Sequence, residues 1–107
     1  KPYLYFDIWV LYHIISKEPL ANFMPTISFF YGIYIMMNLR NKEHNPPHIH
    51  AFYGENAATF YISNGEIYEG DFPSKAKKMV KEFILSYQKE LLNMWETEKY
   101  YKLKGLD

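Results

Sequence analysis

Three of the four histidines lie close together, in the run His44-Asn45-Pro46-Pro47-His48-Ile49-His50. An imidazole with a pKa near ~6.5 can transfer protons at neutral pH, and neutral imidazole is a common metal ligand. If 48–53 is extended, His48 and His50 point to the same face, with their Cα atoms ~6–7 Å apart. The two prolines stiffen the backbone that leads from His44 to this strand. This run is therefore the part of the sequence best suited to carry chemistry.

The first interpretation of the run is general acid–base hydrolysis, above all of RNA. A metal-independent ribonuclease needs a base for the 2′-hydroxyl, an acid for the leaving oxygen and a cation for the phosphate. His48 and His50 would form the acid–base pair. The candidate catalytic residues are His44, His48 and His50, and the candidate substrate-binding residues are Arg40, Lys42 and Tyr53.

Two other interpretations stay open on spacing alone. Three imidazoles from His44, His48 and His50 are an acceptable zinc site, and an open fourth position would make it catalytic. A carboxylate could serve as an additional metal ligand or could hydrogen-bond to a metal-bound histidine, and the candidates are Glu43, Glu55 and Glu69. Alternatively, the histidines hydrogen-bond loop carbonyls and only shape a turn.

Length and composition limit what else the chain can be. It has 107 residues, which suits one domain. The absence of cysteine excludes disulfides, thiolate zinc sites and a cysteine nucleophile. Lys+Arg and Asp+Glu both number 12, so the formal charge is zero and a strongly basic nucleic-acid surface is not expected.

Residues 1–23 differ in character from the rest of the chain. The segment is rich in apolar residues but is interrupted by Asp7 and His13, and its apolar run is too short for a bilayer, which needs ~20 residues. Met24-Pro25-Thr26 looks like a natural start. We therefore expect 1–23 to be an N-terminal extension, with translated upstream sequence the favoured origin, and 24–107 to be a single domain.

The regular part of the sequence predicts strands followed by a helix. Every odd position from Ile27 to Leu39 is apolar, the period of a half-buried strand, and Gly32 marks a bulge or a tight turn between two shorter strands. Further strands are expected at 48–53, 57–63 and 66–71. Asn64-Gly65 predicts a type I′ hairpin that places Ser63 opposite Glu66 and Ile62 opposite Ile67.

A change of period after Pro73 predicts a helix with Ser74 as its N-cap, running to about Lys99. One apolar stripe of helical spacing runs along it, made of Ala76, Met79, Val80, Phe83, Ile84, Tyr87, Leu91, Met94 and Trp95. The fold class is therefore α+β: an antiparallel sheet of four or five strands with one long C-terminal helix packed on it.

From Met24 onward the chain resembles the bacterial domain-of-unknown-function family numbered 4160. The matching pieces are the start at 24–28, Gly32-Ile33, the histidine run at 44–50, the turn at 53–55, Gly70 with Phe72-Pro73, and Glu90-Leu91-Leu92 with Trp95. The resemblance covers about 80 residues. Against the family's usual length, a final strand is expected to be missing.

The resemblance implies a small bacterial, cytoplasmic protein, often encoded beside a second small domain of unknown function, the family numbered 2442. That layout is like a toxin–antitoxin pair. The leading hypothesis is a toxin-like component that pairs with this antitoxin-like neighbour and acts on RNA, with no cofactor and no membrane partner. A zinc-binding domain and a non-enzymatic interaction module, whose exposed sheet edge pairs with a partner, are the alternatives.

Overall fold

The computed structural model describes residues 24–38 and 46–107. The described part is an α+β fold in which five strands form one sheet and two helices follow them in the sequence. The expected extension at 1–23 lies outside the described residues. No helix in the described ranges is long and apolar enough to cross a membrane.

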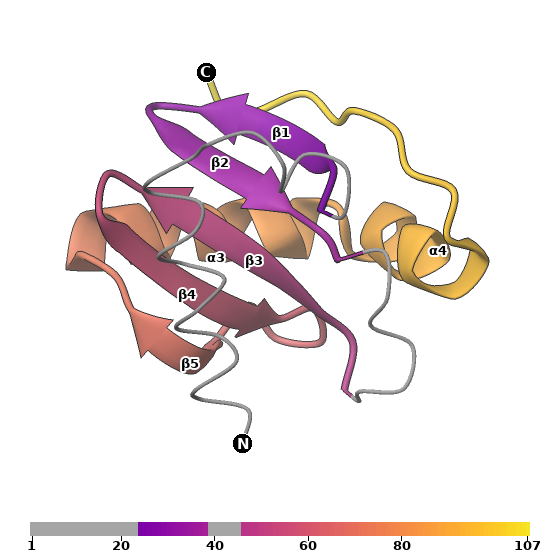
Figure 1. The fold of residues 1–107 in the computed structure, drawn as a ribbon, viewed down its shortest axis with the longest axis horizontal. Coiled ribbons are helices and arrows are strands. Elements are labelled where there is room, and N and C mark those ends of the chain that lie inside the picture. Colours follow the sequence, from indigo (N-terminus) through magenta and orange to yellow (C-terminus); the bar gives the residue numbers. More distant parts are fainter. Residues whose placement is uncertain (1–23, 39–45) are drawn as a thin grey trace.

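The sheet is a simple meander. Its strands are β1 (Thr26–Phe30), β2 (Ile33–Met36), β3 (His48–Tyr53), β4 (Asn56–Tyr61) and β5 (Ile67–Asp71). Each strand pairs antiparallel with the next one in the chain, so the spatial order is β1-β2-β3-β4-β5. The histidine strand β3 is therefore the central strand, and β1 and β5 are the two edges (Figure 1).

The tight turn expected at Gly32 is present and separates β1 from β2. Tyr31 and Gly32 both have positive φ, at 50° and 80°, as a two-residue type I′ loop requires. The next turn follows Tyr53, where Gly54 has a φ of 60° and Tyr53 pairs with Asn56. This two-residue loop sets the register of β3 against β4.

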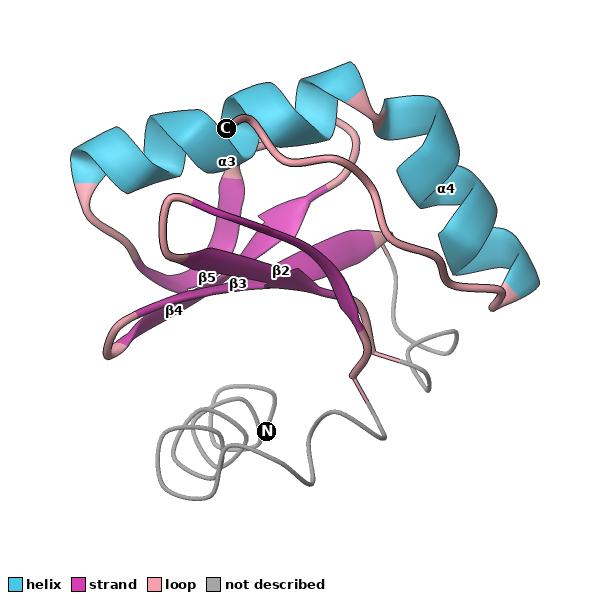
Figure 2. Cartoon of the chain, turned by 90° about the horizontal axis from the view of Figure 1, so that it is seen from above, coloured by secondary structure: helices cyan, strands magenta, loops and turns pink. Residues whose placement is uncertain are grey.

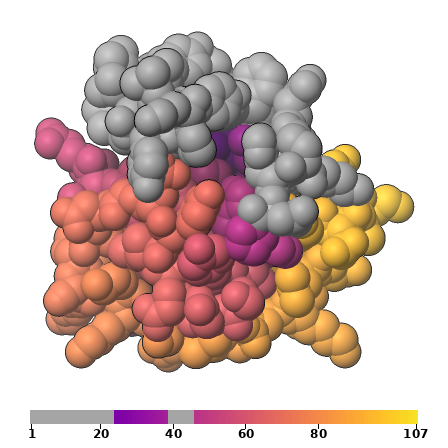
Figure 3. Space-filling view, turned by 90° about the horizontal axis from the view of Figure 1, so that it is seen from below, coloured from indigo at the N-terminus to yellow at the C-terminus, as the bar shows by residue number. Residues whose placement is uncertain are grey.

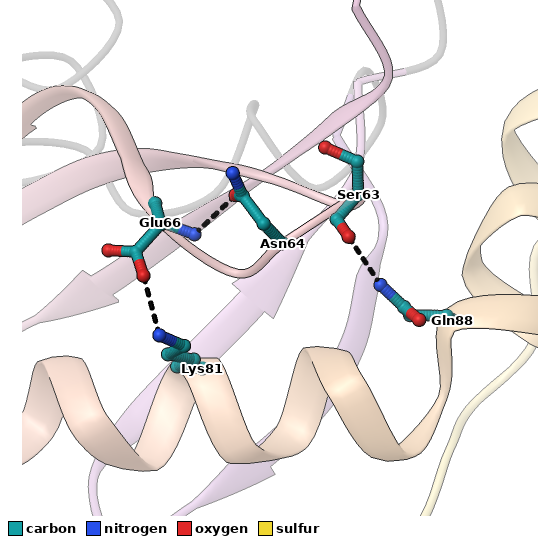
Figure 4. Close-up of polar contacts among 5 residues, drawn as sticks. All are labelled: Ser63, Asn64, Glu66, Lys81 and Gln88. Carbon is teal, nitrogen blue, oxygen red and sulfur yellow. Dashed lines mark hydrogen bonds and ion pairs between the residues drawn. The ribbon is translucent and has the colours of Figure 1, made fainter.

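The register predicted for the last hairpin is wrong. Phe60 pairs with Ile67, and Thr59 pairs with Glu69 across a bulge, so a longer loop replaces the expected two-residue turn. Of the pair Asn64-Gly65, only Gly65 has positive φ. The Asn64 side chain instead accepts a hydrogen bond from the backbone N–H of Glu66, which closes a local turn without the type I′ geometry (Figure 4).

One long helix is expected from the sequence, and the structure has two: α3 (Ser74–Ser86) and α4 (Gln88–Thr97). Tyr87 breaks the helix with φ −124° and ψ 26°, and its N–H is shared between the carbonyls of Phe83 and Ile84. The apolar spacing continues across this residue, which is why periodicity alone does not reveal the break. After it, α4 runs in a different direction from α3 (Figure 2).

The expected N-cap is also wrong by one residue. Pro73 is the capping residue of α3, no side chain caps the helix, and Ser74 is its first helical residue. Pro73 has an extended backbone, and its carbonyl accepts the first helical hydrogen bond from Lys77. The far end is close to the prediction, because α4 ends at Thr97 and Glu98 adopts a left-handed conformation.

The main hydrophobic core lies between the sheet and the two helices. The expected helical stripe points into it: Ala76, Val80, Phe83 and Ile84 are buried on α3, and Leu91, Met94 and Trp95 on α4. From β3, Ile49 and Ala51 enter this core. A second, smaller cluster of Met24, Met36 and Phe52 lies on the opposite face of the sheet, hereafter the second face.

Candidate functional site

Side chains along β3 alternate between the two faces of the sheet, and this alternation decides where its histidines point. Ile49 and Ala51 face the main core, so His48 and His50 share the second face with Phe52. Both histidines are largely buried, with relative exposures of 8% for His48 and 9% for His50. The expectation that two imidazoles lie together on one side of the strand is met, but they lie below the surface.

The two rings are close and nearly perpendicular. Their centroids are 5.3 Å apart, and the angle between the ring planes is 86°. His48 Nδ1 lies 2.9 Å from the carbonyl oxygen of Pro46, and because a carbonyl only accepts, this nitrogen carries the proton. His50 Nδ1 lies 3.3 Å from Thr59 Oγ1 on the neighbouring strand. Each ring is therefore held through Nδ1 by the scaffold.

Aromatic side chains from three other elements complete the site around His48. Trp95 of α4 approaches with a centroid separation of 5.0 Å, and Tyr68 of β5 with 6.2 Å. Tyr68 also packs on Tyr61 at 5.2 Å. Figure 3 shows the start of β3, in magenta, at the surface. It lies between the β4–β5 region, in salmon, and the C-terminal part of the chain, in yellow-orange. The histidine end of β3 is thus a junction of β3, β4, β5 and α4.

Burial controls the protonation of His50. Desolvation, followed by repulsion from the neighbouring His48, lowers the pKa of His50 from 6.5 to about 3. The charged imidazolium is disfavoured because little water reaches the ring. His50 is therefore neutral at physiological pH, which suits a metal ligand or a hydrogen-bonding group better than a general acid.

Of the other candidate catalytic and substrate-binding residues, the structure describes Tyr53, which does not lie at this site. Tyr53 stands at the other end of β3 and faces the other side, where its ring is 6.2 Å from that of Phe72. His44, Arg40 and Lys42 lie outside the described residues, as does Glu43. Within 24–38 and 46–107, no group of three or more His, Cys, Asp or Glu side chains could hold a metal ion.

Several residues of the site are not expected from the sequence, among them Thr59 and Trp95. Thr59 could have been found, because the two-residue turn after Tyr53 pairs His50 directly with Thr59. Trp95 is expected only as a core residue; it is indeed 4% exposed, and it also contacts His48. No spacing rule in the sequence links a residue near the end of α4 to the first residue of β3.

Comparison with known proteins yields one match. A family model described as "Domain of unknown function (DUF4160)" matches residues 32–96, which is more than half of the chain and includes β2 to β5, α3 and nearly all of α4. No curated protein and no solved structure matches the chain.

Proposed function

The chain belongs to the DUF4160 family, and from this premise we propose that it is the toxin-like component of a bacterial toxin–antitoxin pair whose site is a divalent-metal centre built on His48 and His50. The toxin-like role is supported by the resemblance and by the gene layout that the resemblance implies, with a family 2442 protein as the antitoxin-like neighbour. The metal is supported by the geometry of the two rings.

The observation that carries the metal proposal is the 5.3 Å separation of the imidazole centroids. Two imidazoles bound to one tetrahedral zinc, with Zn–N distances of ~2.1 Å, place their ring centroids about 5 Å apart. The anchoring of both Nδ1 atoms to Pro46 and Thr59 is the outer arrangement typical of metal-bound histidines. These two histidines would supply two of the ligands, and His44 stays the third in the sequence-based hypothesis.

The protonation state of His50 favours this proposal over a metal-independent ribonuclease. Metal ions bind the neutral form of histidine, and a pKa of about 3 means that protons do not compete at neutral pH. A general acid or base works best with a pKa near the operating pH. His50 is therefore poorly matched to proton transfer and well matched to coordination.

Zinc titration of the purified full chain tests the metal centre. We expect His48→Gln and His50→Gln each to weaken zinc affinity by about tenfold or more, because each removes a ligand. His13→Gln is the matched control, since it removes the histidine that lies outside the run. Unchanged zinc affinity in both site variants, measured by calorimetry with circular dichroism to verify folding, would refute the centre.

Growth inhibition tests the toxin-like role. Expression of the chain in bacterial cells is expected to slow growth, co-expression of the family 2442 neighbour to restore it, and His50→Gln to remove the inhibition while His13→Gln keeps it. If the wild-type chain never inhibits growth, the toxin-like role is wrong. RNA cleavage that persists in excess EDTA and disappears in His48→Gln would instead favour the metal-independent ribonuclease.

An interaction module without catalysis is the second candidate, favoured by the position of β5. This strand is a sheet edge, and its Tyr68 is 42% exposed beside the histidine site. An extended segment of a partner can add to such an edge. A tight complex with the neighbouring gene product, without zinc binding or RNA cleavage, would support this candidate and count against the metal centre.

A further inference from the structure

The C-terminal tail, residues 98–107, returns from the end of α4 and lies along the edge strand β1 (Figure 1). The backbone N–H of Leu103 donates to the carbonyl of Ile27 over 2.8 Å, and the Ser28 hydroxyl donates to the carbonyl of Leu103 over 2.8 Å. Farther along, the N–H of Tyr31 donates to the Asp107 carboxylate over 3.2 Å. The tail thus occupies the edge where another strand would otherwise pair.

The edge of β1 is shaped for this particular segment. Leu103 and Leu106 pack against the main core. Between them, Gly105 lies so close to Phe30 that a Cβ atom at this position would be 2.5 Å from the Phe30 Cβ. An occupant must therefore bring two apolar side chains with a glycine between them. The tail sequence is the segment that the structure shows to meet this requirement.

The stretch that ties the tail to α4 contains two unfavourable features. Glu98 has a φ of 59°, a left-handed conformation that costs energy for a residue with a side chain. The Tyr100 hydroxyl is buried and has no hydrogen-bond partner within the described part of the chain. Burial of an unsatisfied hydroxyl opposes docking. Both penalties lie in the connection, which also has favourable contacts: Tyr100 packs against the main core, and the Tyr101 N–H contacts Met94 Sδ over 3.5 Å.

We propose that the tail is exchangeable, and that the β1 edge accepts the tail of a second copy of this chain to form a swapped dimer. The contacts of Leu103, Gly105 and Leu106 with β1 are the same in the monomer and in the dimer, because both copies have the same sequence. The left-handed turn at Glu98 is needed only when a tail folds back on its own β1. Exchange of an identical element is a low-cost route to a dimer.

A pair of hinge variants tests the proposal in the full chain. Glu98→Pro cannot adopt positive φ, so the closed monomer is disfavoured, whereas the lost bond from the Glu98 N–H to Met94 affects monomer and dimer alike. Glu98→Gly adopts this φ freely, so the closed monomer is retained. A short linker holds the tail at roughly millimolar effective concentration. We expect light scattering to find Glu98→Pro dimers at about 100-fold lower concentration than wild type, and Glu98→Gly to remain monomeric.

Disulfide trapping tests which surfaces exchange, and it does not depend on a hinge variant that might fail to fold. The chain has no cysteine, so single substitutions can be placed in separate copies. When Tyr31→Cys and Asp107→Cys are mixed, two copies should be joined in excess of random collision where the tail of one lies on β1 of the other. Both substitutions in one chain give the intramolecular control.

The background for trapping comes from Ser63→Cys, in the β4–β5 loop, mixed with Asp107→Cys. A yield of Tyr31–Asp107 heterodimer several times this background is the expected result. A yield equal to the background, or a Glu98→Pro protein that stays folded and monomeric at all concentrations, would overturn the proposal. This outcome is independent of zinc binding by the histidine pair.

Discussion

His50 is a neutral imidazole held in a site that excludes most water, and this couples the stability of the domain to pH. Its folded-state pKa of about 3 is below the ordinary value of 6.5. Between these values the unfolded chain binds a proton that the folded chain does not. The stabilising contribution is therefore complete above pH 6.5 and is lost as pH falls toward 3.

We expect the free energy of unfolding to fall by about 1 kcal/mol per pH unit below pH 6.5, and His50→Gln to flatten this slope. Urea denaturation between pH 5 and 7 measures it. The Glu66 carboxyl does not titrate in this pH range, because the hydrogen bond and the charge of Lys81 lower its pKa below 4.5. Equal slopes for wild type and His50→Gln would show that the ring is not buried in its neutral form.

Among the individual residues, the pairing of His48 with His50 follows from simple alternation along a strand. Their burial does not, because it depends on neighbours that are distant in sequence, such as Trp95 and Tyr68. Burial also sets the pKa of His50, since desolvation is the largest cause of its shift. Chemistry inferred from residue types alone therefore overestimates the ability of this pair to transfer protons.

At the scale of elements, the pairing of β4 with β5 depends on a glycine. Gly70 has a φ of 96°, and a Cβ there would lie 2.5 Å from the Ala57 carbonyl oxygen and 2.8 Å from the Ala58 Cα. Gly54 also has positive φ, but nothing lies within 4 Å of its Cβ position. Substitution of Gly54 therefore tests the backbone strain alone, whereas substitution of Gly70 tests the strain together with a steric clash.

We expect Gly70→Ala to destabilise the domain by about 2–4 kcal/mol and Gly54→Ala by about 1 kcal/mol, because only the first adds a backbone clash to the cost of positive φ. Chemical denaturation of both variants measures the difference. Equal losses would mean that the β4–β5 pairing adjusts to the added methyl group, and that the close approach is not a constraint on the sheet.

The break between α3 and α4 is secured by a contact with the β4–β5 loop. The Gln88 side chain donates to the carbonyls of Ile62 and Ser63, both over 2.8 Å (Figure 4 draws the second). The same loop is joined to α3 by the ion pair of Lys81 with Glu66 at 2.5 Å. The direction of α4, which carries Trp95 to the histidine site, thus rests on this loop.

Loss of the Gln88 contact is expected to cost about 1–2 kcal/mol, because Gln88→Ala leaves two carbonyls without their amide donor. Lys89→Ala is the control on the next, exposed position of the same helix and should change stability by less than about 0.5 kcal/mol. Thermal unfolding of both variants distinguishes them. A Gln88→Ala protein as stable as the control would show that water replaces the amide at no cost.

For the molecule as a whole, one core joins the sheet, the helices and the tail. Phe30 of β1 stacks on Phe83 of α3 with a centroid separation of 5.1 Å, and Gly105 of the tail rests on Phe30. Both phenylalanines are fully buried. Because the domain has a single main core, a substitution that removes this contact should destabilise every strand and helix.

We expect Phe83→Ala to destabilise the fold by about 3–5 kcal/mol, with loss of hydrogen-exchange protection across all five strands. Leu85→Ala, at an exposed position of the same helix, should cost less than about 1 kcal/mol. If Phe83→Ala exposed only the amides of α3 while the strands stayed protected, the helix and the sheet would be separate cooperative units.

Local patterns were sufficient for the elements that depend on neighbours in sequence. The α+β class, the strand at 48–53, an interruption at Gly32 and the helical stripe all follow from hydrophobic period and turn chemistry, and the structure shows that the interruption is a tight turn and not a bulge. These features depend on steric preferences within a few residues, and such preferences are written directly in the sequence.

Only the tertiary structure decided the features that depend on packing between distant segments. The bulge in β5, the break at Tyr87 and the approach of Trp95 to His48 each satisfy contacts that no local period encodes. The same holds for the tail beside β1, which lies more than 70 residues away in sequence. Burial and backbone pairing over such separations are properties of the assembled core, which is why they change the chemistry expected of the two histidines.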